Sequence, residues 1–130
     1  MDLTLQNALL SPQLELAFQK LVAYLLMQSI KSIPSKEPMP GITGYYAHGD
    51  KHTFGYVELK KGTIVPEHHH LHEQITYVIE GQLDMTIDGK LCSLTPGMVQ
   101  IIPSNTPHGA TAVKDCKIID TFSPTREDYK

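Results

Sequence analysis

The sequence predicts an all-β barrel preceded by one α-helix. Beyond residue 45, short runs rich in β-branched and aromatic side chains alternate with Gly, Pro, Asn and Asp turn signals. Before residue 34, apolar residues instead recur at the spacing of a helix face. A chain of 130 residues is long enough for one domain with its own core. We therefore expect a helical extension and linker over residues 1–40 and a barrel over residues 41–130.

The predicted helix begins at Ser11-Pro12, because Ser is a good N-cap and Pro suits the first helical position. One apolar face follows, made of Leu14, Phe18, Leu21, Val22 and Leu25. Further apolar residues extend beyond that face: Ala23, Tyr24, Leu26 and Met27. A helix that is apolar on more than one side is expected to be buried on more than one side. Pro34 and the Pro-Gly-rich residues 38–41 end this part of the chain.

The strands are expected over residues 54–59, 74–79, 83–87, 91–94, 99–102, 109–113 and 117–122. Asp88-Gly89 is a strong two-residue turn signal, and it predicts a hairpin between the third and fourth of these strands. The turn pairs Met85 with Cys92 and Leu83 with Leu94, so that all four lie on one face.

The strand that begins at Gln74 predicts an assembly. Gln74 and every second residue after it face the barrel interior, which turns Ile75, Tyr77 and Ile79 outwards. An outer face this apolar is not expected to remain exposed to water. Either the N-terminal helix or a second subunit covers it, and we expect a homodimer.

Composition excludes several classes of function. The net charge of −3 and the absence of any basic run argue against nucleic-acid or membrane-surface partners. Cys92 and Cys116 lack metal or disulfide spacing and are expected to be reduced thiols. The longest apolar run, residues 21–27, is too short to cross a bilayer. The start MDLTLQ lacks the features of a signal peptide, which favours a cytoplasmic protein.

The stretch GTIVPEHHHLHEQITYVIEG, residues 62–81, predicts a metal site. It places His68, His70, His72 and Gln74 at alternate positions, hence on one face of an extended chain. A second stretch, GMVQIIPSNTPH, ends at His108 and supplies one more imidazole. Imidazole and amide oxygen together suit a divalent transition metal.

The other histidines have different interpretations. Three adjacent His residues can be an expression tag, but tags are terminal and this run lies in mid-chain. His69 points to the opposite face. His72 has the right parity but lies where the chain turns back, so we expect a role behind the ligands or exposure to solvent. His48 and His52 carry no ligand spacing and are expected on the surface.

These two stretches resemble the paired motifs of the cupin superfamily. Gly62, His68, His70, Gln74 and Gly81 fall on the first motif, with Gln74 in place of its acid. The second motif is matched by Gly97, Pro103, Asn105 and His108, with Asn105 for a Gly and Ala112 for the final Asn. Asn tolerates a left-handed turn better than most residues. The resemblance implies a double-stranded β-helix, or jelly-roll barrel, with metal held by His68, His70, Gln74 and His108.

Gln74 in place of an acid changes the charge of such a site. Three neutral imidazoles and an amide leave a divalent metal at net +2, where a carboxylate ligand would leave it at +1. This site favours an anionic oxygen ligand. Small molecules that carry a carboxylate are therefore the expected substrate class.

The end of the sequence adds three candidate residues. Asp120 and Phe122 share the parity of Ile118 and would face the interior, and Arg126 follows shortly afterwards. A carboxylate inside a barrel is costly unless it is paired or functional. From spacing alone, a salt bridge between Asp120 and Arg126 is an equal alternative to a catalytic role.

HEQITYVIEG, IPSNTPH and DTFSPTREDY together resemble the KdgF-type cupins of pectin and alginate degradation. The resemblance implies a metal of unspecified identity (Ni, Zn, Mn or Fe) and activity carried by Asp120, Phe122 and Arg126. It also implies conversion of 4,5-unsaturated monouronates, small anionic sugar acids, to linear keto acids. Two other classes remain open: a cupin dioxygenase or other small-molecule metalloenzyme, and a non-catalytic sugar-binding cupin.

Overall fold

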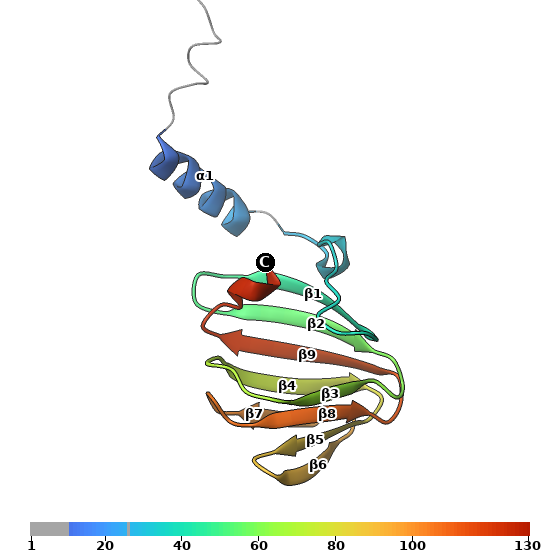
Figure 1. Cartoon of the computed structure of the whole chain (residues 1–130). Helices are drawn as coiled ribbons and strands as arrows, with labels where there is room; N and C mark the ends of the chain where they lie inside the picture. Colours follow the sequence, from blue (N-terminus) through green and yellow to red (C-terminus); the bar gives the residue numbers. More distant parts are fainter. Residues whose placement is uncertain (1–10, 26) are drawn as a thin grey trace, which may run out of the picture.

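The computed structural model describes residues 11–25 and 27–130, and it shows two facing antiparallel sheets with a helix outside them (Figure 1). The larger sheet has the strand order β1-β2-β9-β4-β7 and the smaller one β3-β8-β5-β6. The strands are β1 (Ile42–His48), β2 (Thr53–Leu59), β3 (Ile64–His68), β4 (Glu73–Glu80), β5 (Leu83–Ile87), β6 (Lys90–Leu94), β7 (Val99–Ile102), β8 (His108–Ala112) and β9 (Cys116–Ser123). The expected all-β barrel with an N-terminal helix is confirmed.

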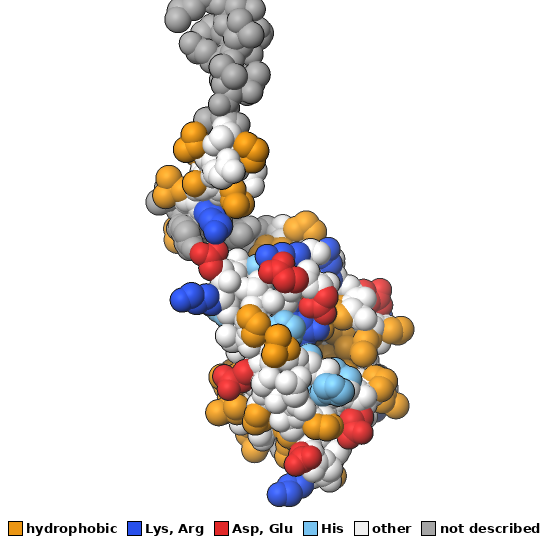
Figure 2. All heavy atoms as spheres, turned by 60° about the vertical axis from the view of Figure 1, so that its left-hand side comes forward, with side chains coloured by type: hydrophobic (Ala, Val, Ile, Leu, Met, Phe, Trp, Pro, Cys, Tyr) orange, Lys and Arg blue, Asp and Glu red, His pale blue; other side chains and the backbone are white. Residues whose placement is uncertain are grey.

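Helix α1 (Pro12–Leu25) begins where the sequence predicts, since the Leu14 amide donates to Ser11 Oγ at 3.2 Å. The helix projects away from the barrel (Figure 1) and carries exposed hydrophobic side chains (Figure 2). Leu14, Phe18 and Leu21 are 54–60% exposed, so the expected burial of this face within the chain does not occur. The side chains of residues 23–26 and the MDLTLQ segment lie outside the described residues. Within the described part, no helix is long and apolar enough to cross a membrane.

The predicted hairpin has the predicted register. Met85 pairs with Cys92 and Leu83 with Leu94. Asp88 and Gly89 at the turn have φ values of 49° and 78°, as a tight hairpin of this hand requires. Leu83, Met85 and Leu94 are buried in the core between the two sheets.

Strand β4 has the predicted division between its faces. Gln74, Thr76 and Val78 are at most 7% exposed and point into the barrel. Tyr77 and Ile79 point outwards and are 39% and 37% exposed. Because α1 lies elsewhere, the helix does not cover this outer face.

The linker before β1 is part of the barrel wall. Lys36 and Gly44 exchange backbone hydrogen bonds of 2.8 Å in both directions. Met39 packs against the hydrophobic core, and its carbonyl accepts from the Ile42 amide at 3.1 Å. The boundary expected at residue 40 remains a prediction, but the chain already lies against the barrel from Lys36. Two short 3-10 helices, η2 (Ile30–Ser32) and η3 (Glu127–Tyr129), complete the described elements.

Candidate metal centre and active site

Three of the predicted metal ligands meet inside the barrel. His68 ends β3, His70 follows it in the next loop, and His108 begins β8, where it pairs directly with His68. Their potential ligand nitrogens all lie within 4.8 Å of one another. Asn105 has a φ of 59°, so it adopts the left-handed conformation expected of it in the turn before His108.

Backbone carbonyls orient the three imidazole rings. The Nδ1 atoms of His68, His70 and His108 lie 2.8, 2.9 and 2.7 Å from the carbonyls of Pro66, His72 and Thr106. A ring that donates its Nδ1–H to a carbonyl leaves Nε2 as a lone pair for a metal. His108 Nε2 is buried and has no hydrogen-bond partner within the protein. This is expected of a nitrogen whose lone pair binds a metal.

Burial favours the neutral form of two of these rings. Desolvation lowers the pKa of His70, and the positive charge of Arg126 lowers it further. Desolvation also lowers the pKa of His108. Neutral imidazole is the form that binds metals, so the pocket favours the binding-competent state before any metal arrives.

Gln74 completes a donor set that fits a cation. Its Nε2 donates to Thr76 Oγ1 at 3.0 Å and to Asp120 Oδ1 at 3.1 Å, which turns its Oε1 towards the histidines. Oε1 lies 3.1 Å from His70 Nε2. With Nδ1 of His70 donated to a carbonyl, this places two lone pairs opposite each other, and a cation would relieve their repulsion. The residues present therefore fit a transition metal, while Gln74 as its fourth ligand remains a prediction.

Asp120 lies beside this donor set on β9. Thr76 Oγ1 donates to Asp120 Oδ1 at 2.6 Å, in addition to the bond from Gln74. Burial raises the pKa of the Asp120 carboxyl, against the opposing effect of those two hydrogen bonds and of Arg126. A carboxyl whose pKa is raised is suited to exchange a proton with a ligand near neutral pH.

The alternative salt bridge between Asp120 and Arg126 is not formed. The Arg126 guanidinium binds Asp128 instead, with Nε to Oδ1 at 2.9 Å and Nη2 to Oδ2 at 2.7 Å. Its Cζ lies 4.7 Å from the Phe122 ring centre and 3.9 Å from that of Tyr129. Two aromatic faces and a bidentate carboxylate hold the guanidinium in place.

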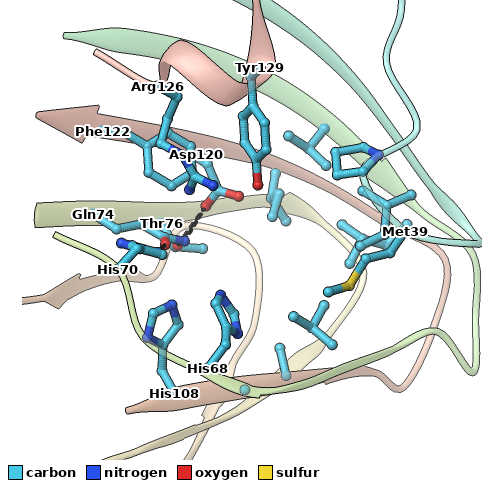
Figure 3. Close-up of a pocket in the computed structure, with 18 of the residues that line it drawn as sticks. Met39, His68, His70, Gln74, Thr76, His108, Asp120, Phe122, Arg126 and Tyr129 are labelled. Atoms are coloured by element: carbon cyan, nitrogen blue, oxygen red, sulfur yellow. Dashed lines mark hydrogen bonds between the residues drawn. The ribbon is translucent and has the colours of Figure 1, made fainter. Parts of the chain in front are cut away.

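Tyr129 is a pocket residue that sequence reasoning missed. Helix η3 brings it over the barrel, where its hydroxyl points into the cavity (Figure 3). Its ring contacts Tyr46, with centroids 4.7 Å apart, and meets Phe122 edge-on at 5.9 Å. Burial raises the pKa of the Tyr129 phenol. No spacing in the sequence marks this residue, because the return of the tail to the pocket is a long-range contact.

The remaining histidines divide into three cases. His52 is exposed, as expected, and His69, which was expected on the face opposite the ligands, is exposed as well. His72 is half-buried beside the pocket, with its ring 5.6 Å from that of His70 and its Nδ1 buried without a partner. The surface interpretation of His48 is wrong: it is half-buried, its Nδ1 lies 2.9 Å from Thr53 Oγ1, and burial lowers its pKa. That same Thr53 oxygen accepts from the Arg126 amide at 2.9 Å, so this pair helps to hold the tail.

The predicted metal-binding and catalytic residues line one cavity of about 550 Å³ between the two sheets. His68, His70 and His108 occupy one side of it with Gln74 and Asp120. Phe122, Arg126 and Tyr129 lie above them (Figure 3). Met39 lies across the cavity from His70. The structure thus brings all seven predicted metal-binding and catalytic residues into one pocket, and their roles remain predictions.

Comparison with known proteins places the chain in a family. The cupin domain family matches residues 55–122, just over half of the chain. The pectin degradation protein KdgF of Dickeya dadantii (strain 3937) is 36% identical over 75 residues, which are 56% of this chain and 68% of that protein.

Two solved structures agree with this assignment. The structure of KdgF from Halomonas sp. is 31% identical, covers 78% of this chain and 98% of its own, and superposes with a TM-score of 0.71. An RmlC-like cupin from Shewanella frigidimarina is 28% identical, covers 80% of this chain and 95% of its own, and has a TM-score of 0.75. With its paired histidine motifs folded into one pocket of a two-sheet barrel, the chain belongs to the cupin family and resembles KdgF.

Proposed function

We propose that this chain is a metal-dependent cupin that converts 4,5-unsaturated monouronates to linear keto acids. The observation that carries the proposal is the contact between Gln74 and Asp120, which joins the expected metal ligands to a carboxyl of raised pKa. The similarity to a pectin degradation protein supports a substrate of this class.

The metal would be held by His68, His70, His108 and Gln74. When bound, it supplies Lewis-acid polarisation of substrate oxygens. Because all four protein ligands are neutral, a divalent metal would retain its full +2 charge. The site would therefore favour a substrate that carries an acidic group.

Arg126 positions the substrate by binding the substrate carboxylate. Arg126 is only 8% exposed, and the two aromatic neighbours of its guanidinium leave it little freedom to move. A planar guanidinium binds a carboxylate through two parallel hydrogen bonds. Asp128 occupies that edge in the present structure and is itself largely exposed, so a substrate carboxylate can compete with it. Phe122 then forms the wall against which the sugar ring packs.

Asp120 moves the proton in this proposal. The reaction is an isomerisation: the hemiacetal proton leaves, the C1–ring oxygen bond breaks to give an aldehyde, and the resulting C5 enolate takes up a proton at C4 to become a ketone. No oxidant or co-reactant is needed. A carboxyl of raised pKa can accept the first proton and return one to C4. The hydrogen bonds from Thr76 and Gln74 fix the carboxyl during both transfers.

A lyase-coupled assay tests the proposal. Unsaturated galacturonate released by a pectate lyase should lose its ultraviolet absorbance faster with this protein than without it, and a linear keto acid should accumulate. Elemental analysis of the same preparation should show one transition metal per chain. Metal-loaded protein that leaves the unsaturated monouronate unchanged would contradict the proposal and favour a binding role.

A further inference from the structure

The cavity continues well beyond the residues that the proposed reaction uses. Most of its polar residues gather on one side, whereas Met39 and carbon-only side chains surround the opposite side (Figure 3). The exposed Lys36 and Glu37, which precede Met39 in the chain, also line the cavity. Pockets of roughly 300–1,000 Å³ hold drug-sized ligands, and this one measures about 550 Å³. The registers of the strands show how the composition of the wall changes along the barrel.

The larger sheet changes from polar to apolar along its inward face. On β9 the inward residues are Phe122 and Asp120, followed by Ile118, which pairs with Val78 of β4. Two residues along a strand span about 7 Å, so Ile118 lies one such step beyond the Asp120 carboxyl. Val78 is fully buried and offers no polar atom from its side chain.

The smaller sheet makes the same change in the same direction. On β8, His108 is followed on its inward face by Ala110 and Ala112. These two alanines pair with Met85 and Leu83 of β5, which are 3% and 2% exposed. Both walls of the barrel therefore become apolar at one end, away from the histidines.

A segment outside the nine strands closes that end. Met39, which precedes β1, lines the cavity and packs against the core. We call the resulting space the apolar chamber, and it is lined by Met39, Ile42, Leu59, Leu83, Met85 and Ile118.

We propose that the apolar chamber is a second subsite, which takes the hydrocarbon part of a carboxylate ligand. A sugar hydroxyl placed there would lose its water and gain no hydrogen-bond partner from these side chains. An alkyl or aryl group would instead gain from leaving water. The ligand class of this pocket thus includes acids with an apolar group opposite the carboxylate, and is not confined to hydroxyl-rich sugar acids.

The inference rests on the proposed function in one respect, the position of the ligand carboxylate at the Arg126 end of the pocket. It does not depend on turnover. It therefore goes beyond ketonisation, and binding measurements alone can test it.

Calorimetric titration of the metal-loaded protein with acetate, butyrate, hexanoate and octanoate tests the chamber directly. If successive methylene groups enter it, affinity should rise about fourfold for each one, as expected for a buried methylene group. Affinity that does not change with chain length, or no binding of any alkanoate, would overturn the proposal.

Paired substitutions locate the binding. Met39→Glu places a carboxylate in the chamber and should abolish the gain from chain length while acetate still binds. Met98→Glu is the matched control, since Met98 is 47% exposed and does not line the cavity. A chain-length gain that survives Met39→Glu, or that Met98→Glu removes, would place the alkyl chains outside the chamber. Melting temperatures of both variants verify folding, and the chain-length series on the unaltered protein decides the matter if Met39→Glu does not fold.

The lyase-coupled assay on the same preparations separates the two proposals. Conversion of the uronate with a flat alkanoate series would overturn the chamber and retain the proposed function. Affinity that rises along the alkanoate series, without conversion of the uronate, would retain the chamber and overturn the proposed function.

Discussion

The two faces of strand β4 contrast sharply. Its inward face carries Gln74 and Thr76, which are buried and polar, whereas its outward face carries Tyr77 and Ile79, which are partly exposed and apolar. This partly inverts the usual arrangement of a sheet over a core. The inner polar groups are satisfied, because Gln74 and Thr76 both donate to Asp120. From this difference we expect the interior near the histidines to serve chemistry and the exterior to serve contact.

Removing a metal ligand should have the largest effect of any change to the inner face. We expect His70→Ala to lose its metal and to reduce turnover to the uncatalysed background. Loss of a hydrogen-bond partner behind a ligand already costs roughly 10–100-fold in metal affinity, and loss of the ligand itself should cost more. Elemental analysis and the lyase-coupled assay provide the measurements. His69→Ala is the matched control, because His69 is exposed, and full metal content in His70→Ala would contradict the assignment.

Asp120→Asn should have the next largest effect. An amide does not titrate, so turnover should fall by roughly 10²–10⁴-fold if Asp120 transfers the proton. Metal content and melting temperature should change little, because Asn can still accept from Thr76. Asp84→Asn is a suitable control, since Asp84 on β5 also accepts side-chain hydrogen bonds, from Gln82 and Ser93. Full activity in Asp120→Asn would remove this residue from the mechanism.

Tyr129→Phe should have a smaller effect that falls on binding. The ring and its stacking on Arg126 remain, while the hydroxyl that points into the pocket is lost. A neutral hydrogen bond contributes about 1 kcal/mol, so KM should rise about fivefold with kcat nearly unchanged. Tyr56→Phe is the control, because Tyr56 pairs with Tyr45 and does not line the pocket. An unaltered KM would show that the hydroxyl makes no contact with substrate.

Period-two alternation explains why so much of the barrel was predictable. Parity alone assigned Gln74 to the inside and Tyr77 to the outside, and the Asp88-Gly89 turn determined the register of Met85 with Cys92. Motif spacing brought His108 to the other histidines although it lies 38 residues beyond His70.

Tyr129, His48 and Met39 escaped prediction because their positions depend on contacts between distant segments without a repeating pattern. Tyr129 reaches the pocket because the tail folds back over β2, where Thr53 binds the Arg126 amide. His48 is half-buried by the same return of the tail. Met39 becomes a wall of the cavity because the linker pairs with β1. Local propensity contains no information about such docking.

Substitutions on the outer face of β4 should alter assembly and leave turnover intact. They are the sharpest test of the contrast between the two faces. The outward residues of β4 continue onto the edge strand β7, where Ile75 pairs with Ile101 and Tyr77 with Val99. Val99 and Ile101 are 60% and 55% exposed. A continuous apolar face at a sheet edge is a surface on which a second copy can pack.

We therefore expect a homodimer that buries this face. Tyr77→Lys combined with Val99→Lys should produce monomers by light scattering at micromolar concentration, because two copies would then bring four lysine charges into one apolar interface. The substituted side chains point away from the pocket, so metal content and uronate conversion per chain should match those of the unaltered protein. A monomeric unaltered protein would leave the face uncovered and refute the dimer. Loss of conversion in a folded, monomeric variant would instead show that the inner face depends on the partner, and the two faces of β4 would then not be independent.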